Sequence, residues 1–555
     1  MDVNDIRSEP GPKEVVRGKQ AVCSSSHPIV TNTMLKVLQD RGNAVDAGIA
    51  GSMVQASVQP HMTNHTGTVT FLYYEAKTGI TYQLNSSGTL VPDLPPFRPM
   101  PAGSGVYAPE GRPPPMAAIP GFMPGMKALF ERFATRKWAD LCEAAIHYSE
   151  EGHEVSSYEY GVLNDALTFN TFFPSGRKLF TPDGFTPRVG ERFKNPDLAG
   201  TMRRTAAEGP DYMITGGWAQ EFVQTANDMG WEITPDHMTA NPPRWVDPLR
   251  FEHNGHEIVQ LSPPERQGVF CALVLGILKG LDIQSRGHYT ESAEALYCMA
   301  QALRWADFEV GFVHDPETFH QPLDRWLAAD HHQAIAGIIG GSLPKIDLSD
   351  HVRHSHGGNA MHAGGYSARP QPPTGSCELS IVDRAGNWVQ MMNTLQSGGI
   401  PGMVIGGVPM VGSHAVPDMR ASIAGWIARD TRLRLPIGNT LVMKEGKPWL
   451  SLGTPGNVYC TMPQVLSNIL DYDMEPYDAC VAPRMQPLDD DYTLTIESRL
   501  PEKVVQDIAR LGVFVKSHPP YDWHMGSFQM CWRDAETGLL NSSTGPRRAG
   551  RAAGY

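Results

Sequence analysis

The stretch Gly375-Ser376-Cys377-Glu378-Leu379-Ser380-Ile381-Val382-Asp383 marks the sharpest change of character in this 555-residue chain. Before it, residues 352–375 (VRHSHGGNAMHAGGYSARPQPPTG) contain few apolar side chains and many Gly, Pro and His, which predicts an exposed, poorly ordered loop. After it, the segment SCELSIVD alternates as a strand does, RAGN supplies a turn, and WVQMMNTLQSGG alternates again. A β-hairpin is therefore expected to begin where the loop ends.

The sequence pattern of the N-terminal part predicts a strand, two helices and a hairpin. The strand is expected in GKQAVCSSS from Gly18, and the first helix ends before Gly42. The second helix begins at 43–46, and its small residues (AVDAGIAGSMVQASV) predict very close packing against a sheet. The segments TVTFLYYEA and GITYQLNSS predict a hairpin with its turn at 77–79.

The sequence pattern of the remaining chain predicts a helical middle region and a second hairpin. Residues 116–343 are expected to form a helical layer with loops, including a buried helix at 268–281. The second hairpin lies in NTLVMKEGKPWLSLGT, with Glu445-Gly446 at the turn, and a helix follows in MPQVLSNILDY.

Composition restricts the class of protein. The net charge of −13 argues against a nucleic-acid or anionic-membrane binder, and 41% hydrophobic residues suffice for a large core. The segment 268–281 is too short to span a membrane, and the N-terminus lacks the apolar run of a secretion signal. The eight cysteines form no CxxC pair, which predicts buried thiols in a reducing compartment. We therefore expect a cytoplasmic protein whose partners are small molecules.

Two cofactor classes find no support in the sequence. Histidines gather before Ser376, at His351, His354, His356 and His362, but a mobile loop offers no rigid geometry to a metal. The chain also lacks a P-loop, a GxGxxG motif after a strand, a GxSxG elbow and an HExxH motif. No metal or other cofactor is expected.

Several motifs in the same order resemble the γ-glutamyltransferase family of N-terminal-nucleophile (Ntn) hydrolases. In that family a precursor cuts itself before a Thr, sometimes Ser, that begins a strand of the form Thr-x-His-aromatic-Ser-Val-Val-Asp. Here the matching residues are Ser380, Ile381-Val382-Asp383 and Gly386-Asn387, which place Ser376 at the nucleophile position. Further similarities extend from Gly18 to Tyr555: Gly42-Asn43-Ala44-Val45-Asp46-Ala47, Ser262-Pro263-Pro264, Thr454-Pro455-Gly456 and Ala553-Gly554-Tyr555.

The resemblance implies an α/β (α+β) fold, a four-layer αββα sandwich of largely antiparallel sheets. Cleavage between Gly375 and Ser376 would give a large chain, 1–375, and a small chain, 376–555, which together form one composite domain and an α/β heterodimer. Whether that heterodimer dimerises further stays open. The family positions also imply that Thr394 orients the nucleophile and that Gly456 and Asn457 form the oxyanion hole.

The chemistry of Ser376 fits self-cleavage. A serine hydroxyl needs a base, and the α-amine freed by the cut, with an ordinary pKa near 7.7–8.0, is one. The same hydroxyl can attack the Gly375 carbonyl, where the absence of a Cβ permits the bent backbone that this attack requires.

Departures from the family pattern concern the substrate. The family holds a glutamyl carboxylate with an Arg and a Ser-Ser pair, where this chain carries Asn85 and Leu435-Pro436. Gln396 and Asp418 match positions that contact the substrate amino group, and Arg432 or Arg434 could supply a replacement cation, although a solvated surface position is favoured for both arginines. The family's His two residues after the nucleophile is Glu378 here.

These features predict an autoprocessing zymogen that hydrolyses a small amide, with an acyl group other than γ-glutamyl, through a seryl ester on Ser376. Carbon–carbon bond hydrolysis by the same nucleophile, or a γ-glutamyl transferase or hydrolase reaction, remains an alternative. An unprocessed, non-catalytic binding protein is the alternative from another class. Simpler interpretations also stand: Thr394 as a structural β-former, and Asp46 as a helix cap or the anchor of a buried network.

Overall fold

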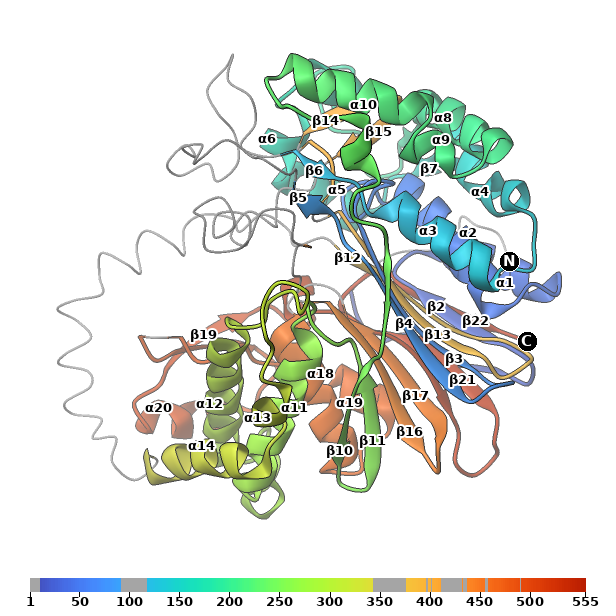
Figure 1. Ribbon diagram of the computed structural model, residues 1–555. Coiled ribbons are helices and arrows are strands. Elements are labelled where there is room, and N and C mark those ends of the chain that lie inside the picture. Colours follow the sequence, from blue (N-terminus) through green and yellow to red (C-terminus); the bar gives the residue numbers. More distant parts are fainter. Residues whose placement is uncertain are drawn as a thin grey trace.

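Two seven-stranded sheets lie face to face between two layers of helices (Figure 1). The computed structural model describes residues 10–90, 117–342, 376–395, 398–400, 402–410, 432, 437–454, 458–489 and 491–555. Within these ranges the predicted αββα sandwich is confirmed, and every strand pair inside the two large sheets is antiparallel.

The first sheet contains the strand that begins with Ser376. Its order is β22 (Arg551–Gly554), β2 (Val22–Ser25), β12 (Ser376–Val382), β13 (Trp388–Thr394), β3 (Thr68–Glu75), β4 (Ile80–Ser86) and β9 (Arg244–Val246). The hairpin predicted after the loop is thus β12–β13, and it lies near the middle of the sheet. The hairpin predicted at residues 68–86 is β3–β4.

The second sheet packs against the first. Its order is β1 (Val16–Gly18), β21 (Leu540–Thr544), β20 (Gln529–Arg533), β17 (Lys447–Thr454), β16 (Gly438–Lys444), β11 (His256–Gln260) and β10 (Leu249–His253). The predicted hairpin at Glu445-Gly446 is confirmed as β16–β17, and both turn residues have positive φ. The middle region, however, is not helices and loops alone, because β9, β10 and β11 extend both sheets.

Side chains from both sheets form a shared core between them. Trp388 and Met392 of β13 pack with Leu441 of β16 and Val259 of β11. Ser380 of β12 meets Ser451 of β17 across the gap, with 2.6 Å between their hydroxyl oxygens. One face of β12 therefore points toward the second sheet, and alternate residues point toward the helices.

Helices cover the outer face of each sheet. On the first sheet lie α1 (Pro28–Gln39), α2 (Ala44–Val58) and α3 (Phe122–Phe133), with α4 (Trp138–Glu151), α8 (Pro196–Glu208) and α10 (Gly217–Asp228) farther out. On the second sheet lie α11 (Gln267–Gly280) and α18 (Val458–Leu470), with α12 (Ala293–Val310) and α14 (Ala329–Ser342) packed beside α11.

Shorter elements complete the described fold. The short helices are α5 (Ser157–Asp165), α6 (Leu167–Asn170), α7 (Pro174–Phe180), α9 (Asp211–Ile214), α13 (Leu323–Trp326), α19 (Pro476–Val481) and α20 (Glu502–Arg510). The two-stranded pairs are β5 (Thr89–Leu90) with β6 (Ala118–Ile119), β7 (His153–Glu154) with β8 (Arg192–Phe193), β14 (Met403–Ile405) with β15 (Val408–Met410), and β18 (Thr493–Glu497) with β19 (Phe514–His518). No helix in the described ranges has the length and apolarity needed to cross a membrane.

Helix α2 packs closely on β12 and β13, as its small residues predict. A Cβ on Gly51 would lie 3.3 Å from Leu379 of β12, so this helix surface lies very near the sheet. Asp46 caps α2 in a reciprocal capping box with Asn43 and also accepts hydrogen bonds from the backbone of Thr135 and Arg136. The interpretation of Asp46 as a cap and network anchor is confirmed.

Candidate active site

Ser376 is the first residue of β12 and lies opposite Thr394, the last residue of β13. Its Oγ donates a hydrogen bond to Thr394 Oγ1 at 3.1 Å, and both residues are buried. Just before the neighbouring strand β3, a Cβ on Gly67 would lie only 1.7 Å from the Thr394 carbonyl oxygen. Glycine at position 67 therefore lets the chain before β3 lie against the backbone at the end of β13.

Arg548, which follows β21, contacts the same residue from the opposite side. Its Nη1 donates to the carbonyl oxygen of Ser376 at 2.8 Å, and only 1% of the arginine is exposed. The guanidinium carbon lies 5.9 Å from the ring centres of both Tyr158 and Trp523. The site thus combines a hydroxyl pair with a buried cation.

Glu378 lies two residues beyond Ser376 on β12 and is fully buried. Neither of its carboxyl oxygens has a hydrogen-bond partner in the part of the chain that the structure describes. Burial raises the pKa of Glu378 well above its ordinary value, and nearby Arg548 lowers it only in part. Burial therefore favours the uncharged acid, an environment that the sequence alone did not indicate.

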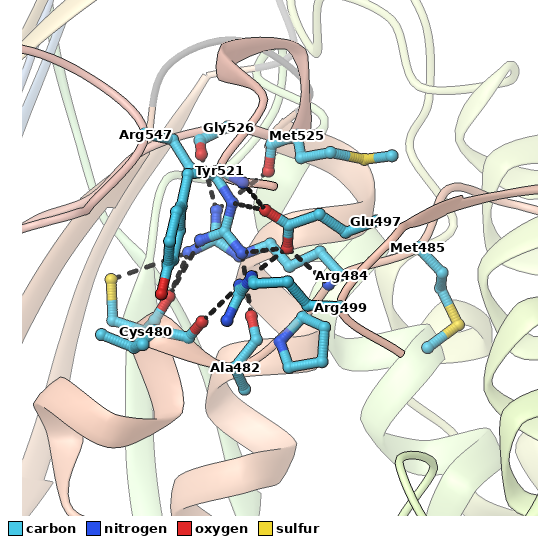
Figure 2. A network of polar contacts seen from close by, with 12 residues as sticks. Cys480, Ala482, Arg484, Met485, Glu497, Arg499, Tyr521, Met525, Gly526 and Arg547 are labelled. Atoms are coloured by element: carbon cyan, nitrogen blue, oxygen red, sulfur yellow. Dashed lines mark hydrogen bonds and ion pairs between the residues drawn. The ribbon is translucent and has the colours of Figure 1, made fainter. Parts of the chain in front are cut away.

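The loop that carries Arg548 is anchored by a second cluster of buried charges (Figure 2). Arg547 donates to both carboxyl oxygens of Glu497, at 2.6 and 3.2 Å, and to the carbonyl oxygens of Cys480 and Ala482. The backbone N–H of Arg484 donates to Glu497, and the side chain of Arg484 donates to the carbonyl oxygens of Met525 and Gly526. Arg547 is therefore fully used by the fold, unlike its neighbour Arg548.

Neither Arg548 nor this anchoring cluster was predicted from the sequence. The available signal was the repeated arginine in GPRRAGRAAGY, next to the matched Ala-Gly-Tyr end. That segment has the composition of a solvated tail, yet Arg547 and Arg548 are 0% and 1% exposed.

A buried histidine cluster lies behind the nucleophile strand. Glu159 of α5 accepts from His153 Nε2 at 2.9 Å and lies 3.7 Å from His61 Nδ1. Burial lowers the pKa of His61 to about 4 and that of His27 to about 3, so both are neutral at pH 7. Burial alone would raise the pKa of Glu159, but His153 and the other histidines lower it overall. Among the residues that the structure describes, no group of three or more His, Cys, Asp or Glu could hold a metal ion.

Two predicted substrate contacts lie elsewhere in the polar interior. Asn85 of β4 is buried and donates its amide to Glu265 at 2.6 Å. Arg432 was expected at the solvated surface, and this was wrong, because it is 3% exposed and bonded to the carbonyls of Ser87 and Pro242. The pKa of Arg432 is lowered to about 10, mainly by burial and to a lesser extent by the positive charge of Arg244.

The remaining predicted positions fall outside the described residues. These are the cleavage partner Gly375, the oxyanion residues Gly456 and Asn457, the candidate substrate contacts Gln396, Asp418 and Arg434, and the loop 352–375 with its histidines. The described neighbours of the oxyanion segment are the end of β17 at Thr454 and the start of α18 at Val458.

Comparisons with known proteins agree with this geometry. The family model described as Gamma-glutamyltranspeptidase matches residues 31–555. The chain is 26% identical to the Glutathione hydrolase-like YwrD proenzyme of Bacillus subtilis (strain 168), over 98% of this chain and 99% of that protein. It is 24% identical to the Acylase ACY 1 proenzyme of Pseudomonas sp. (strain SE83), over 97% of this chain and 96% of that one.

A solved structure shows the same fold over nearly the whole length. The crystal structure of cephalosporin acylase from Bacillus halodurans superposes with a TM-score of 0.80 at 21% identity and covers 98% of both chains. The chain therefore belongs to the gamma-glutamyltranspeptidase family and is a γ-glutamyltransferase-like hydrolase with the Ntn-hydrolase fold.

Proposed function

We propose that the chain cuts itself before Ser376 and then hydrolyses a small amide, with an acyl group other than γ-glutamyl, through a seryl ester. The observation that carries this proposal is the Ser376 Oγ to Thr394 Oγ1 hydrogen bond at the first residue of β12. Two relatives, the YwrD and ACY 1 proteins, carry the word proenzyme in their names, which supports self-cleavage here.

The cut and the later turnover use one hydroxyl. In the cut, Ser376 Oγ attacks the Gly375 carbonyl carbon, the C–N bond breaks, and the nitrogen becomes the α-amine of Ser376. Water then hydrolyses the ester and leaves Gly375 with a carboxylate. In turnover, Oγ loses its proton to that amine and attacks the substrate carbonyl, and the amine returns a proton to the leaving nitrogen. A second water hydrolyses the acyl ester and restores Ser376.

The contacts of Asn85 support an acyl group other than γ-glutamyl. At the position that the family pattern assigns to a carboxylate-binding Arg, this chain has an amide whose nitrogen is already bonded to Glu265. The similarity to an acylase points in the same direction. For the compartment, we propose a reducing one such as the cytoplasm, which is supported by eight buried cysteines that form no disulfide with one another.

Intact mass under denaturing conditions tests the cut. Wild-type protein should give fragments 1–375 and 376–555, whereas Ser376→Ala should remain one chain of 60.8 kDa without amidase activity. Ser380→Ala is the matched control, because Ser380 is a buried serine of the same strand that bonds Ser451 instead. It should be cut as wild type is.

Substrate class is tested with a panel of p-nitroanilides that differ only in the acyl group and include γ-glutamyl-p-nitroanilide. Several non-γ-glutamyl members should be hydrolysed faster than the γ-glutamyl one. A folded wild-type protein that stays whole and hydrolyses none of them would instead support a non-catalytic binding role.

A further inference from the structure

Arg548 occupies a place that a neighbouring strand would otherwise fill. Strand β2 pairs with β12 only from Leu379 to Val382, so among the described residues no strand pairs with Ser376 on that side. There the carbonyl oxygen of Ser376 accepts the hydrogen bond from Arg548 Nη1. Among the described residues, Nε and Nη2 of the same guanidinium have no hydrogen-bond partner, and Arg548 is 1% exposed.

The guanidinium of Arg548 makes fewer hydrogen bonds with the rest of the fold than the guanidinium of Arg547 does. Arg547 makes four hydrogen bonds to Glu497 and to two backbone carbonyls. Arg548 makes one, and that bond goes to the nucleophile residue. Burying a cation with unused donors is costly unless the charge acts on something nearby.

Covalent geometry fixes how near that charge is to the amine that the cut releases. The nitrogen and carbonyl oxygen of one residue lie at most about 3.6 Å apart. With 2.8 Å from Nη1 to the Ser376 oxygen, the guanidinium nitrogen lies within about 6.4 Å of the Ser376 nitrogen. A like charge at such a distance disfavours protonation of the amine.

We propose that Arg548 is a positioning residue that holds the first residue of the cut chain in its strand and keeps the α-amine of Ser376 uncharged, as a general base must be. The inference rests on the proposed function, since an α-amine exists only after the cut. It extends that function by assigning a residue to the activation of the base.

Burial disfavours charge on most of the other described ionisable groups around the nucleophile, so these groups do little to cancel the charge of Arg548. On β12, burial raises the pKa of Glu378 well above its ordinary value and that of Cys377 to about 12. From α5, burial raises the pKa of Tyr158. From the segment before β3, burial lowers the pKa of His61 to about 4. Glu159 of α5 is ionised, but it is bonded to His153.

Competitive labelling of the terminal amine measures its protonation directly. Acetic anhydride modifies only uncharged amines. Mass spectrometry of the N-terminal peptide of the small chain, labelled at a series of pH values, gives the labelling midpoint, which is the pH at which labelling reaches half of its maximum. The midpoint of wild-type protein should lie at least about 1 pH unit below the ordinary 7.7–8.0 of an α-amine. In Arg548→Met it should rise by about 1–2 units, and in Arg548→Lys, which keeps the charge, by less than about half a unit.

Glu378→Gln is the matched control. It alters a buried neighbour on the same strand, and because burial raises the pKa of Glu378 and so favours its uncharged form, the labelling midpoint of this variant should stay near that of wild type. In parallel, the kcat of Arg548→Met for the best p-nitroanilide at pH 7 should fall about 10- to 100-fold, with a smaller change in KM, and higher pH should restore part of the loss.

Self-cleavage is measured first, so that a failure of the proposed function can be distinguished from a failure of the proposed role of Arg548. A wild-type chain that stays whole contradicts the proposed function. A folded Arg548→Met protein that is cut but keeps the wild-type midpoint contradicts the role of Arg548, as does a folded variant that is not cut. An equal shift in Glu378→Gln also contradicts it. If Arg548→Met does not fold, Arg548→Lys decides, and a rise of 1 unit or more there overturns the proposal.

Discussion

Replacing Glu497 with Gln tests the anchoring cluster of Figure 2. Its carboxylate accepts from Arg547 Nε and Nη2, from Arg499 Nη2, and from the backbone N–H groups of Arg484 and Tyr521. Gln keeps the shape but removes the charge, and its amide directs a donor at groups that are themselves donors. Three arginines then lose their shared counter-ion, and Arg547 and Arg484 are completely buried.

The magnitude follows from breaking a buried ion pair by removing one partner, which costs about 3–5 kcal/mol. A chain of 555 residues that unfolds as one unit has an unfolding entropy of about 1.2 kcal/mol/K. A loss of about 4 kcal/mol therefore lowers Tm by about 3 °C. Because Arg548 follows Arg547 directly, the hydrogen bond to Ser376 is also expected to loosen, with slower self-cleavage.

Differential scanning calorimetry of Glu497→Gln against wild type measures this loss. Glu502→Gln is the control, because Glu502 is exposed and should change Tm by less than about 0.5 °C. Burial alone would raise the pKa of Glu497, but Arg547 and its neighbours lower it overall. Its ionised form thus contributes stability above the unfolded pKa near 4.3, and this contribution is lost as pH falls through the lower folded value. A Tm for Glu497→Gln equal to that of wild type at pH 7 would refute the reasoning.

Three further predictions follow from the same contacts. Thr394→Val removes the hydroxyl that accepts from Ser376 and should slow self-cleavage about 10-fold in time courses on denaturing gels, whereas an unchanged rate would leave Thr394 a structural role only. Gly453→Ala places a Cβ 1.9 Å from Gln390 Nε2 and should cost about 1–3 kcal/mol in denaturant unfolding, unlike Gly200→Ala, whose Cβ meets open space. Asp46→Ala removes the carboxylate half of the α2 capping box and its hydrogen bonds to Thr135 and Arg136, and should cost about 2 kcal/mol or more by the same measurement; a smaller loss would show that water replaces the carboxylate.

Local pattern was sufficient for much of the fold. The alternation around Ser376, the stop at Gly42 and the turn at Glu445-Gly446 each predicted an element that the structure confirms. Strands β9 to β11 were not predicted, because they are short and part of their pairing is remote. Val246 pairs with Gln83 and Glu257 with Met443, so these partners are absent from any local window.

The same limit applies to the site. The contact between Ser376 and Thr394 follows from the register of one hairpin, and sequence spacing could indicate it. Arg548 lies 172 residues from Ser376 in the sequence and still donates a hydrogen bond to it. Arg432 is buried and donates to the carbonyl oxygens of Ser87 and Pro242, which belong to two other segments. A charged side chain in a polar segment gives no local sign of such burial.

Both large sheets interleave strands from before and after residue 375. In the first, β2 lies between β22 and β12, and in the second, β16 lies between β11 and β17. If the chain is cut at the proposed site, neither part can leave without breaking strand pairs in both sheets, so the two parts resist dissociation. Recovery after denaturation, however, becomes a bimolecular event. The covalent link no longer sets an effective concentration for the two parts, and refolding of cut protein should depend on protein concentration whereas refolding of Ser376→Ala should not.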